Sequence, residues 1–198
     1  MKSKKILSFF IFFIISISSI SNSYSITPEV FVQSTVNRAS EALNNIYSKE
    51  EKINKLKNIA KETVDIDGIG LYTLGSYRKG LSDNQKEKYL DLFEEYFLKS
   101  FASRLAEYSN PEIKVSTSKK LNENYSMVSS SLVATEQRPE VKIDWRIYTK
   151  NPENLLIRDL IIEGLSLART QKEEFASIIQ SNDGEIEALF ETLKNFVK

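Results

Sequence analysis

The chain has 198 residues, with 27 basic and 27 acidic side chains and with neither histidine nor cysteine. The lack of cysteine excludes disulfides, thiol nucleophiles and thiolate metal sites, and the lack of histidine removes the usual general base and the commonest metal ligand. Three of the basic residues lie in the leader described next, which leaves an acidic excess of three, and no basic cluster with interleaved aromatic residues indicates a nucleic-acid partner.

Residues 1–25 have the pattern of a secretory signal peptide. Three lysines within the first five residues precede an apolar run over residues 6–15, and a serine-rich stretch follows. The small side chains of Ser23 and Ser25 suit cleavage by a signal peptidase before Ile26. An uncleaved anchor helix is the alternative, but a membrane span needs about 20 mainly apolar residues and serines interrupt this run. We therefore expect an exported, periplasmic protein.

The mature domain, residues 26–198, begins with helical periodicity. Apolar residues recur at helical spacing over residues 28–47 and 50–64. Asp65 or Asp67 can cap a short third helix. A capping-box pattern over residues 82–85 then predicts a long helix that ends near Tyr108. One face of this long helix is strongly apolar and consists of Tyr89, Phe93, Tyr96, Phe97, Phe101 and Leu105.

After residue 110 the period changes to two. The strand candidates are residues 113–115, 124–135, 141–148 and 155–162. In the third candidate, apolar residues alternate most clearly with other types; they are Val141, Ile143, Trp145 and Ile147. Helical patterns return after Gly164, and Asp183 is the expected cap of the last helix. This order predicts an α+β fold with helices packed on one side of a twisted, four-stranded antiparallel sheet.

The sequence offers two candidates for a catalytic site. Gly68, Gly70 and Gly75 do not have the spacing of a phosphate-binding loop, and no strand precedes them. Asp144, Asp159 and another carboxylate at Glu163 flank strands and could form an acid–base pair of the kind used in glycoside hydrolysis. That enzyme hypothesis requires two carboxylates that converge in a polar cleft with different pKa values.

Four groups of segments, spread over nearly the whole mature chain, share the order and spacing of one known family. They are residues 74–78 with 81–85, residues 93–97 with 101–105 and Tyr108, residues 159–167, and residues 173–175 before Leu189. These segments resemble the MlaC family, the periplasmic component of the Mla lipid-transport pathway, which is also called the toluene-tolerance family. The chain departs from the family at Tyr77, where tryptophan is usual, and at Arg158, where tyrosine is usual.

The resemblance implies an NTF2-like cone of sheet and helices that encloses an apolar lipid cavity. It implies a non-catalytic phospholipid carrier with no metal, nucleotide or other cofactor of its own. It also implies two membrane partners, which are an outer-membrane lipoprotein–porin complex and an inner-membrane ABC transporter that bears an MCE-domain protein.

We expect the aromatic helix face and the alternating third strand to form opposite walls of this cavity. The expected lining is Phe93, Phe97, Phe101, Val141, Ile143, Trp145, Ile147, Leu160 and Ile162. Tyr77 and Arg78 are expected at the mouth, where a cation could meet a phosphate, although a surface salt bridge is the alternative for Arg78. A periplasmic adaptor or chaperone, which would bind proteins through exposed apolar patches, is the alternative function.

Overall fold

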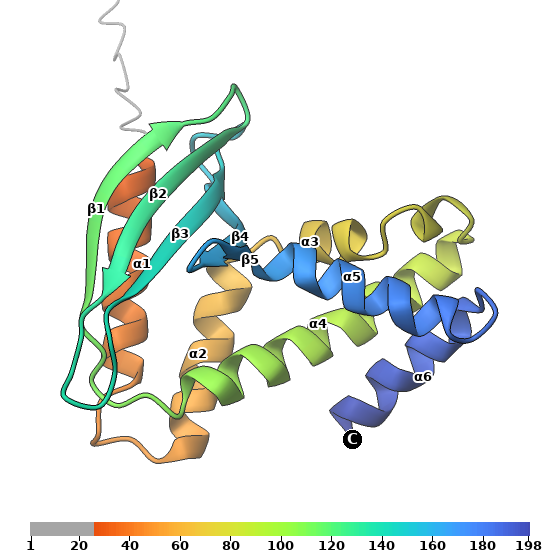
Figure 1. Cartoon of the computed structure of the whole chain (residues 1–198), viewed down its shortest axis with the longest axis horizontal. Coiled ribbons are helices and arrows are strands. Elements are labelled where there is room, and N and C mark those ends of the chain that lie inside the picture. The colour runs from red at the N-terminus through yellow and green to blue at the C-terminus, as the bar shows by residue number, and fades with distance from the viewer. Residues whose placement is uncertain (1–25) are drawn as a thin grey trace, which may run out of the picture.

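The computed structural model describes residues 26–198, so the expected signal peptide, residues 1–25, lies outside the described residues. Within the described range the chain forms six α-helices, one short 3-10 helix and five strands (Figure 1). The helices are α1 (Pro28–Ala42), α2 (Lys49–Thr63), α3 (Ile66–Thr73), η1 (Tyr77–Lys79), α4 (Asp83–Leu105), α5 (Leu167–Gln180) and α6 (Ile186–Val197). The strands are β1 (Ile113–Lys120), β2 (Tyr125–Leu132), β3 (Val141–Tyr148), β4 (Leu156–Ile162) and β5 (Leu165–Ser166).

Side-chain caps fix where several helices begin. The capping box predicted for α4 is present, because the Ser82 hydroxyl accepts from Gln85 N and the Gln85 side chain accepts from Ser82 N. Asp65, one of the two caps predicted for α3, accepts a hydrogen bond from Gly68 N. The cap predicted for α6 is wrong: Glu185 is the N-cap residue, and Asp183 adopts a φ of 56° in the preceding turn.

The strands form one antiparallel sheet in the order β1-β2-β3-β4-β5. The expected number of four strands is wrong, because the two-residue strand β5 extends the sheet beyond β4. A two-residue turn joins β4 to β5, with φ angles of 50° at Glu163 and 83° at Gly164. Positive φ at both central residues is the geometry of a type I′ hairpin turn, which suits the twist of the flanking strands.

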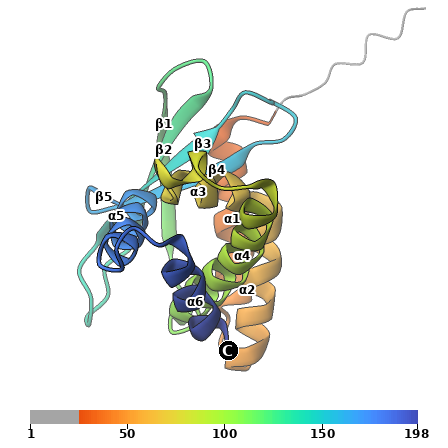
Figure 2. The same ribbon diagram turned by 90° about the vertical axis from the view of Figure 1, so that its right-hand side faces the viewer.

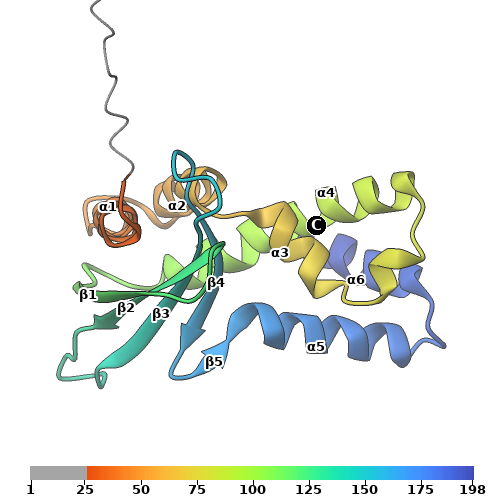
Figure 3. The same cartoon turned by 90° about the horizontal axis from the view of Figure 1, so that it is seen from above.

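One face of the sheet packs against α1 (Figure 3). Its apolar side chains come from alternate positions on β2, β3 and β4, and they meet two valines of α1. The buried cluster consists of Val32, Val36, Val128, Trp145, Ile147, Leu155 and Ile157. We call this surface of the sheet the closed face. The indole N–H of Trp145 donates to Ser130 Oγ (2.8 Å), so the polar atom buried there is also satisfied.

The helices α3, α4, α5 and α6 form a second lobe, which joins the first where α2 packs on α4 and where α3 and α5 meet β4. In Figure 2, α6 lies between α4 and α5, and it contacts both. The interior of this lobe is rich in aromatic rings; its fully buried aromatic residues are Tyr89, Phe93, Phe175 and Phe190. We call this group, with the apolar residues packed on it, the aromatic cluster. No helix within residues 26–198 has both the length and the apolar character needed to cross a bilayer.

Candidate functional site

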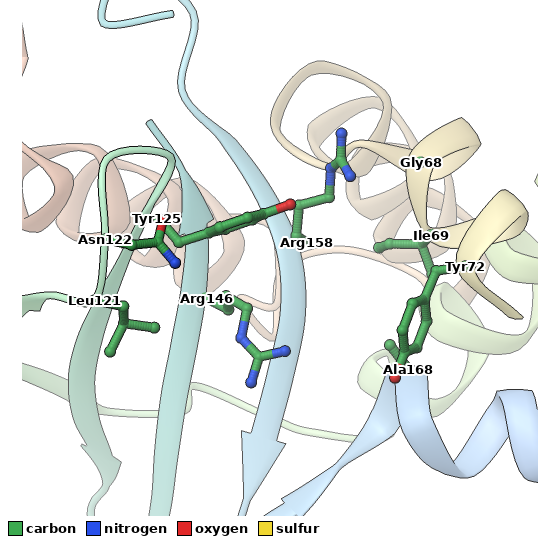
Figure 4. Close-up of a pocket in the computed structure, with 9 residues that line it drawn as sticks. All are labelled: Gly68, Ile69, Tyr72, Leu121, Asn122, Tyr125, Arg146, Arg158 and Ala168. Atoms are coloured by element: carbon green, nitrogen blue, oxygen red, sulfur yellow. The ribbon is translucent and has the colours of Figure 1, made fainter. Parts of the chain in front are cut away.

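A cavity of about 380 Å³ lies on the side of the sheet opposite to α1, between the sheet and the helices α3 and α5 (Figure 4). We call this side of the sheet the open face. The lining residues come from α3, from β2 and the turn before it, from β3 and β4, and from the start of α5. They are Gly68, Ile69, Tyr72, Leu121, Asn122, Tyr125, Arg146, Arg158 and Ala168.

The pleat of the sheet explains why arginine lines this cavity. Trp145 and Ile147 are buried on the closed face, and Arg146 between them must point to the open face because successive side chains of a strand alternate. The β3–β4 register shifts at this point, so that Arg146 pairs with Asp159 whereas Ile147 pairs with Ile157. Arg158 therefore has no pairing partner on β3 and forms a β-bulge. A bulge changes the direction in which a side chain points.

Arg158 is held firmly between α3 and the sheet. Its Nε lies against Asp65 Oδ2 in an ion pair, although the N–H direction does not make this contact a hydrogen bond. The guanidinium also lies 4.7 Å from the centre of the Tyr148 ring. A side chain at Gly68 would collide with this arrangement, because a Cβ there would lie 2.7 Å from Arg158 Cζ. Glycine at that position lets Arg158 and Asp65 approach α3 closely, and a larger residue would displace their side chains.

Arg146 has much weaker partners. Its Nη1 lies 3.5 Å from Asp159 Oδ2, and its side chain is 40% exposed. The Asp159 side chain is buried and already accepts two shorter hydrogen bonds, from Ser166 Oγ (2.6 Å) and from Ala168 N (3.0 Å). Asp159 thus ties the first turn of α5 to the sheet, and Arg146 lies beside it without a hydrogen bond of normal length.

The other side of the cavity is apolar and adjoins the aromatic cluster. Ile69 of α3 and Ala168 of α5 line the cavity and also belong to the buried aromatic cluster. Tyr72 of α3 lines it as well and is 42% exposed, so it extends the apolar lining of this side to the surface. Leu121, which is 43% exposed, lies across the cavity beyond Arg146 (Figure 4). The cavity therefore has one cationic wall and one apolar wall, and the apolar wall leads toward the interior of the helical lobe.

The carboxylates considered for catalysis do not form an acid–base pair at this cavity. Asp144 accepts from Ser129 Oγ (2.6 Å), Glu163 accepts from Lys142 N (2.5 Å), and Asp159 has the partners given above. None of the three lines the cavity. Within residues 26–198, no group of three or more acidic residues is placed to hold a metal ion.

Comparison with known proteins identifies the family. A sequence model described as "MlaC protein" matches residues 32–195. The chain belongs to the MlaC family. The family resemblance stated from the sequence is thereby confirmed.

One sequence relative and one solved structure are similar to this chain. The MlaC binding protein of an intermembrane phospholipid transport system from Haemophilus influenzae is 30% identical over 106 residues, which is 50% of this chain and 48% of that protein. The match thus spans about half the length of that relative. A phospholipid-binding protein from Ralstonia solanacearum, solved in complex with a phospholipid, superimposes with a TM-score of 0.72 over 87% of this chain and 97% of that one, at 18% identity. This likeness confirms the α+β fold.

In this MlaC-family chain, the predicted lining residues fall into two groups that do not face one another. Those on the sheet belong to the closed face. Trp145 and Ile147 are buried against α1, and Ile143 and Leu160 pack beside them. The cross-strand register places Val141 and Ile162 on the same side of the sheet. Phe93, Phe97 and Phe101 belong to the aromatic cluster of the helical lobe. The expectation that these two groups form opposite walls is wrong, and contact of any of these residues with lipid stays a prediction.

Tyr77 and Arg78, expected at the mouth, do not line this cavity. Tyr77 packs against the aromatic cluster, and Arg78 is an exposed residue of η1 whose Nη1 donates to Leu71 O (3.3 Å). The arginines that do line the cavity are Arg146 and Arg158, which sequence reasoning missed. Arg146 lies at a position that also suits a solvent-facing strand residue, and the bulge that places Arg158 has no clear sequence signal.

Proposed function

We propose that this protein is a non-catalytic phospholipid carrier of the periplasm, exported by the signal peptide in residues 1–25. The observation that carries the proposal is the cavity on the open face, whose apolar wall consists of residues that also belong to the aromatic cluster. The Ralstonia relative of the same fold was solved with a phospholipid bound, and the Haemophilus relative is named as a binding protein of phospholipid transport.

The energetics of moving a lipid explain why such a cavity is needed. Two acyl chains with about 30 methylenes between them cost roughly 24 kcal/mol to expose to water, at about 0.8 kcal/mol each. Noncovalent affinities do not exceed roughly 18 to 21 kcal/mol, and a carrier must also release its cargo. The protein therefore has to offset most of this cost by covering the tails with apolar surface, and its contacts with them must be weak enough for release.

The described cavity is at the lower end of the range for small-molecule sites, which is about 300–1,000 Å³. We propose that the tails enlarge it by entering between α3 and α5, beside Ile69 and Ala168. Some aromatic side chains that pack against the same cluster as Ile69 and Ala168 are only partly buried, among them Tyr96, Phe97 and Phe101. Such rings can change packing partners at lower cost than fully buried ones because they lose fewer contacts.

We further propose that the carrier exchanges lipid with an outer-membrane lipoprotein–porin complex and with an inner-membrane ABC transporter that bears an MCE-domain protein. The support is family membership and the transport-system name of the Haemophilus relative. The proposal assigns no catalytic group and no cofactor.

Native mass spectrometry of gently purified protein tests this function. We expect co-purified phospholipid, and we expect lipid-free protein to extract phospholipid from liposomes. Tyr72→Asp places a charge on the apolar wall and should reduce lipid retention by about tenfold or more, since burying an unpaired polar group costs about 1–3 kcal/mol. The matched control is Ile46→Asp, which alters a residue that is 77% exposed and does not line the cavity.

Protein that neither carries lipid nor extracts it would refute the carrier function. If Tyr72→Asp binds lipid as well as Ile46→Asp does, the tails do not use this cavity. Capture of unfolded or partner proteins in the absence of lipid binding would instead support the adaptor or chaperone.

A further inference from the structure

The open-face cavity has positive charge on one wall only. Two of its nine lining residues are arginines, and none is acidic. The apolar residues Ile69, Leu121 and Ala168 line the same cavity. A ligand that matches both walls has an anionic group joined to an apolar portion, and this is the chemical character of a phospholipid.

Arg146 has the unused capacity to bind such an anionic group. A guanidinium carries five N–H donors, and within residues 26–198 its one ion-pair partner, Asp159, lies at 3.5 Å. No hydrogen bond donated by Arg146 is found in the same range, whereas Asp159 is satisfied by Ser166 and Ala168. The donors of Arg146 are thus free to reach a ligand, and the side chain that carries them is 40% exposed.

Arg158 contributes charge but has a different role. Its guanidinium is engaged by Asp65 and stacked over Tyr148, and its side chain is 28% exposed. In Figure 4 the guanidinium groups of Arg146 and Arg158 point in opposite directions from neighbouring strands, so one small anion would not bridge them. Arg158 is therefore a positioning residue that ties β4 to α3.

We propose that Arg146 binds the phosphate of the lipid headgroup on the open face, while the acyl chains extend from the phosphate across the cavity toward Ile69 and Ala168. The inference rests on the proposed function, because it assigns the headgroup subsite of the same cavity. Guanidinium groups suit phosphate because they donate two parallel, charge-assisted hydrogen bonds. This contact would also orient the lipid, since the headgroup stays near the mouth while the tails go inward.

The test compares a lipid that has a phosphate with one that lacks it. Lipid-free protein is incubated with vesicles that contain phosphatidylglycerol or with vesicles that contain diacylglycerol of the same acyl chains, and the captured lipid is measured. Arg146→Gln should reduce the apparent affinity for phosphatidylglycerol about 10- to 100-fold, the range for a lost hydrogen bond to a charged group. Its affinity for diacylglycerol should not change.

A matched control separates this contact from a general change in charge. Arg38→Gln removes a guanidinium of α1 that is 41% exposed and paired with Glu62, and neither residue lines the cavity. It should leave the capture of both lipids unaltered. Arg146→Gln should fold, because Asp159 keeps both shorter hydrogen bonds, and thermal unfolding of the variant checks this. Arg146→Lys keeps the charge and should recover part of the lost affinity.

The outcomes distinguish this inference from the carrier function. If wild-type protein captures neither lipid, the carrier function itself fails. If it captures both and Arg146→Gln changes neither affinity, or changes both equally, the carrier function stands and the headgroup subsite is overturned. Inorganic phosphate provides a further arm: if it raises the Tm of wild-type protein but not of Arg146→Gln, while phosphatidylglycerol capture is equal in both, the site binds a free anion and the lipid assignment is wrong.

Discussion

The two faces of the sheet are built from the same strands but have opposite character. On the closed face, Trp145 and Ile147 pack under α1 with exposed fractions of 9% and 0%. On the open face, Arg146 lies between them in sequence and lines a cavity. The comparison teaches that a single alternating strand can supply core residues and site residues at once, because its side chains alternate between two environments.

The physical reason for the difference is how completely each face is covered. The closed face is packed along β1 and β2 by α1, whereas α3 and α5 contact the open face mainly along β4. Incomplete coverage leaves water access, and water access lets an arginine keep unused donors at little cost. A fully packed face could not hold such a residue without a partner.

The largest effect should come from the closed face. Ile147→Ala removes a fully buried side chain and should lower the free energy of unfolding by about 2–5 kcal/mol, the cost of lost burial plus a cavity. Urea unfolding measures this. The corresponding truncation on the open face, Leu121→Ala, should cost far less because Leu121 is 43% exposed. Equal losses in the two variants would contradict the contrast between the faces.

An intermediate effect is expected at Asp159, which projects from the open face but is buried. Asp159→Ala leaves Ser166 Oγ and Ala168 N without their acceptor. The Ala168 N–H is buried, and its loss of an acceptor costs about 1–3 kcal/mol, whereas the part-buried Ser166 hydroxyl can turn to water. Hydrogen exchange should become faster in the first turn of α5, and the free energy of unfolding should fall. Asp144→Ala is the comparison, since Asp144 accepts one hydrogen bond from Ser129 and is only partly buried. If Asp144→Ala is the more damaging variant, Asp159 does not anchor α5.

The smallest effect concerns the aromatic cluster behind the cavity. Tyr89 OH lies 2.8 Å from Thr73 Oγ1 and donates to Gly70 O (3.1 Å). Tyr89→Phe should lower the free energy of unfolding by about 1 kcal/mol, because Gly70 O still accepts from Thr73 Oγ1 (2.7 Å). Differential scanning calorimetry at neutral pH can resolve this loss.

The same variant has a pH signature. Burial raises the pKa of Tyr89 and also that of Tyr96 above the ordinary tyrosine value. The neutral hydroxyls therefore favour the folded state fully below about pH 10, and this contribution is lost as the pH rises above that value, where the unfolded tyrosines ionise. Tyr89→Phe should make the alkaline loss of stability less steep than in wild type. An unchanged slope would show that Tyr89 is not sequestered from water.

Local sequence patterns predicted much of the fold. The capping box at Ser82 and Gln85 and the aspartate cap at Asp65 are present, and the aromatic face of α4 supplies Tyr89 and Phe93 to the interior. These features depend on residues within one or two turns of one another, so the sequence alone specifies them. Family membership was also evident from the order of the sequence segments.

The pairing of faces was decided by the tertiary structure. Periodicity shows that Trp145 and Ile147 share a face with one another, but not that α1 covers that face while α4 packs with the other helices. The bulge at Arg158 and the edge strand β5 likewise depend on neighbouring strands. A buried side chain needs an apolar environment of any origin. The sequence therefore determined which residues of an element share a buried face, whereas only the folded chain decided which elements cover that face and where the cavity remains.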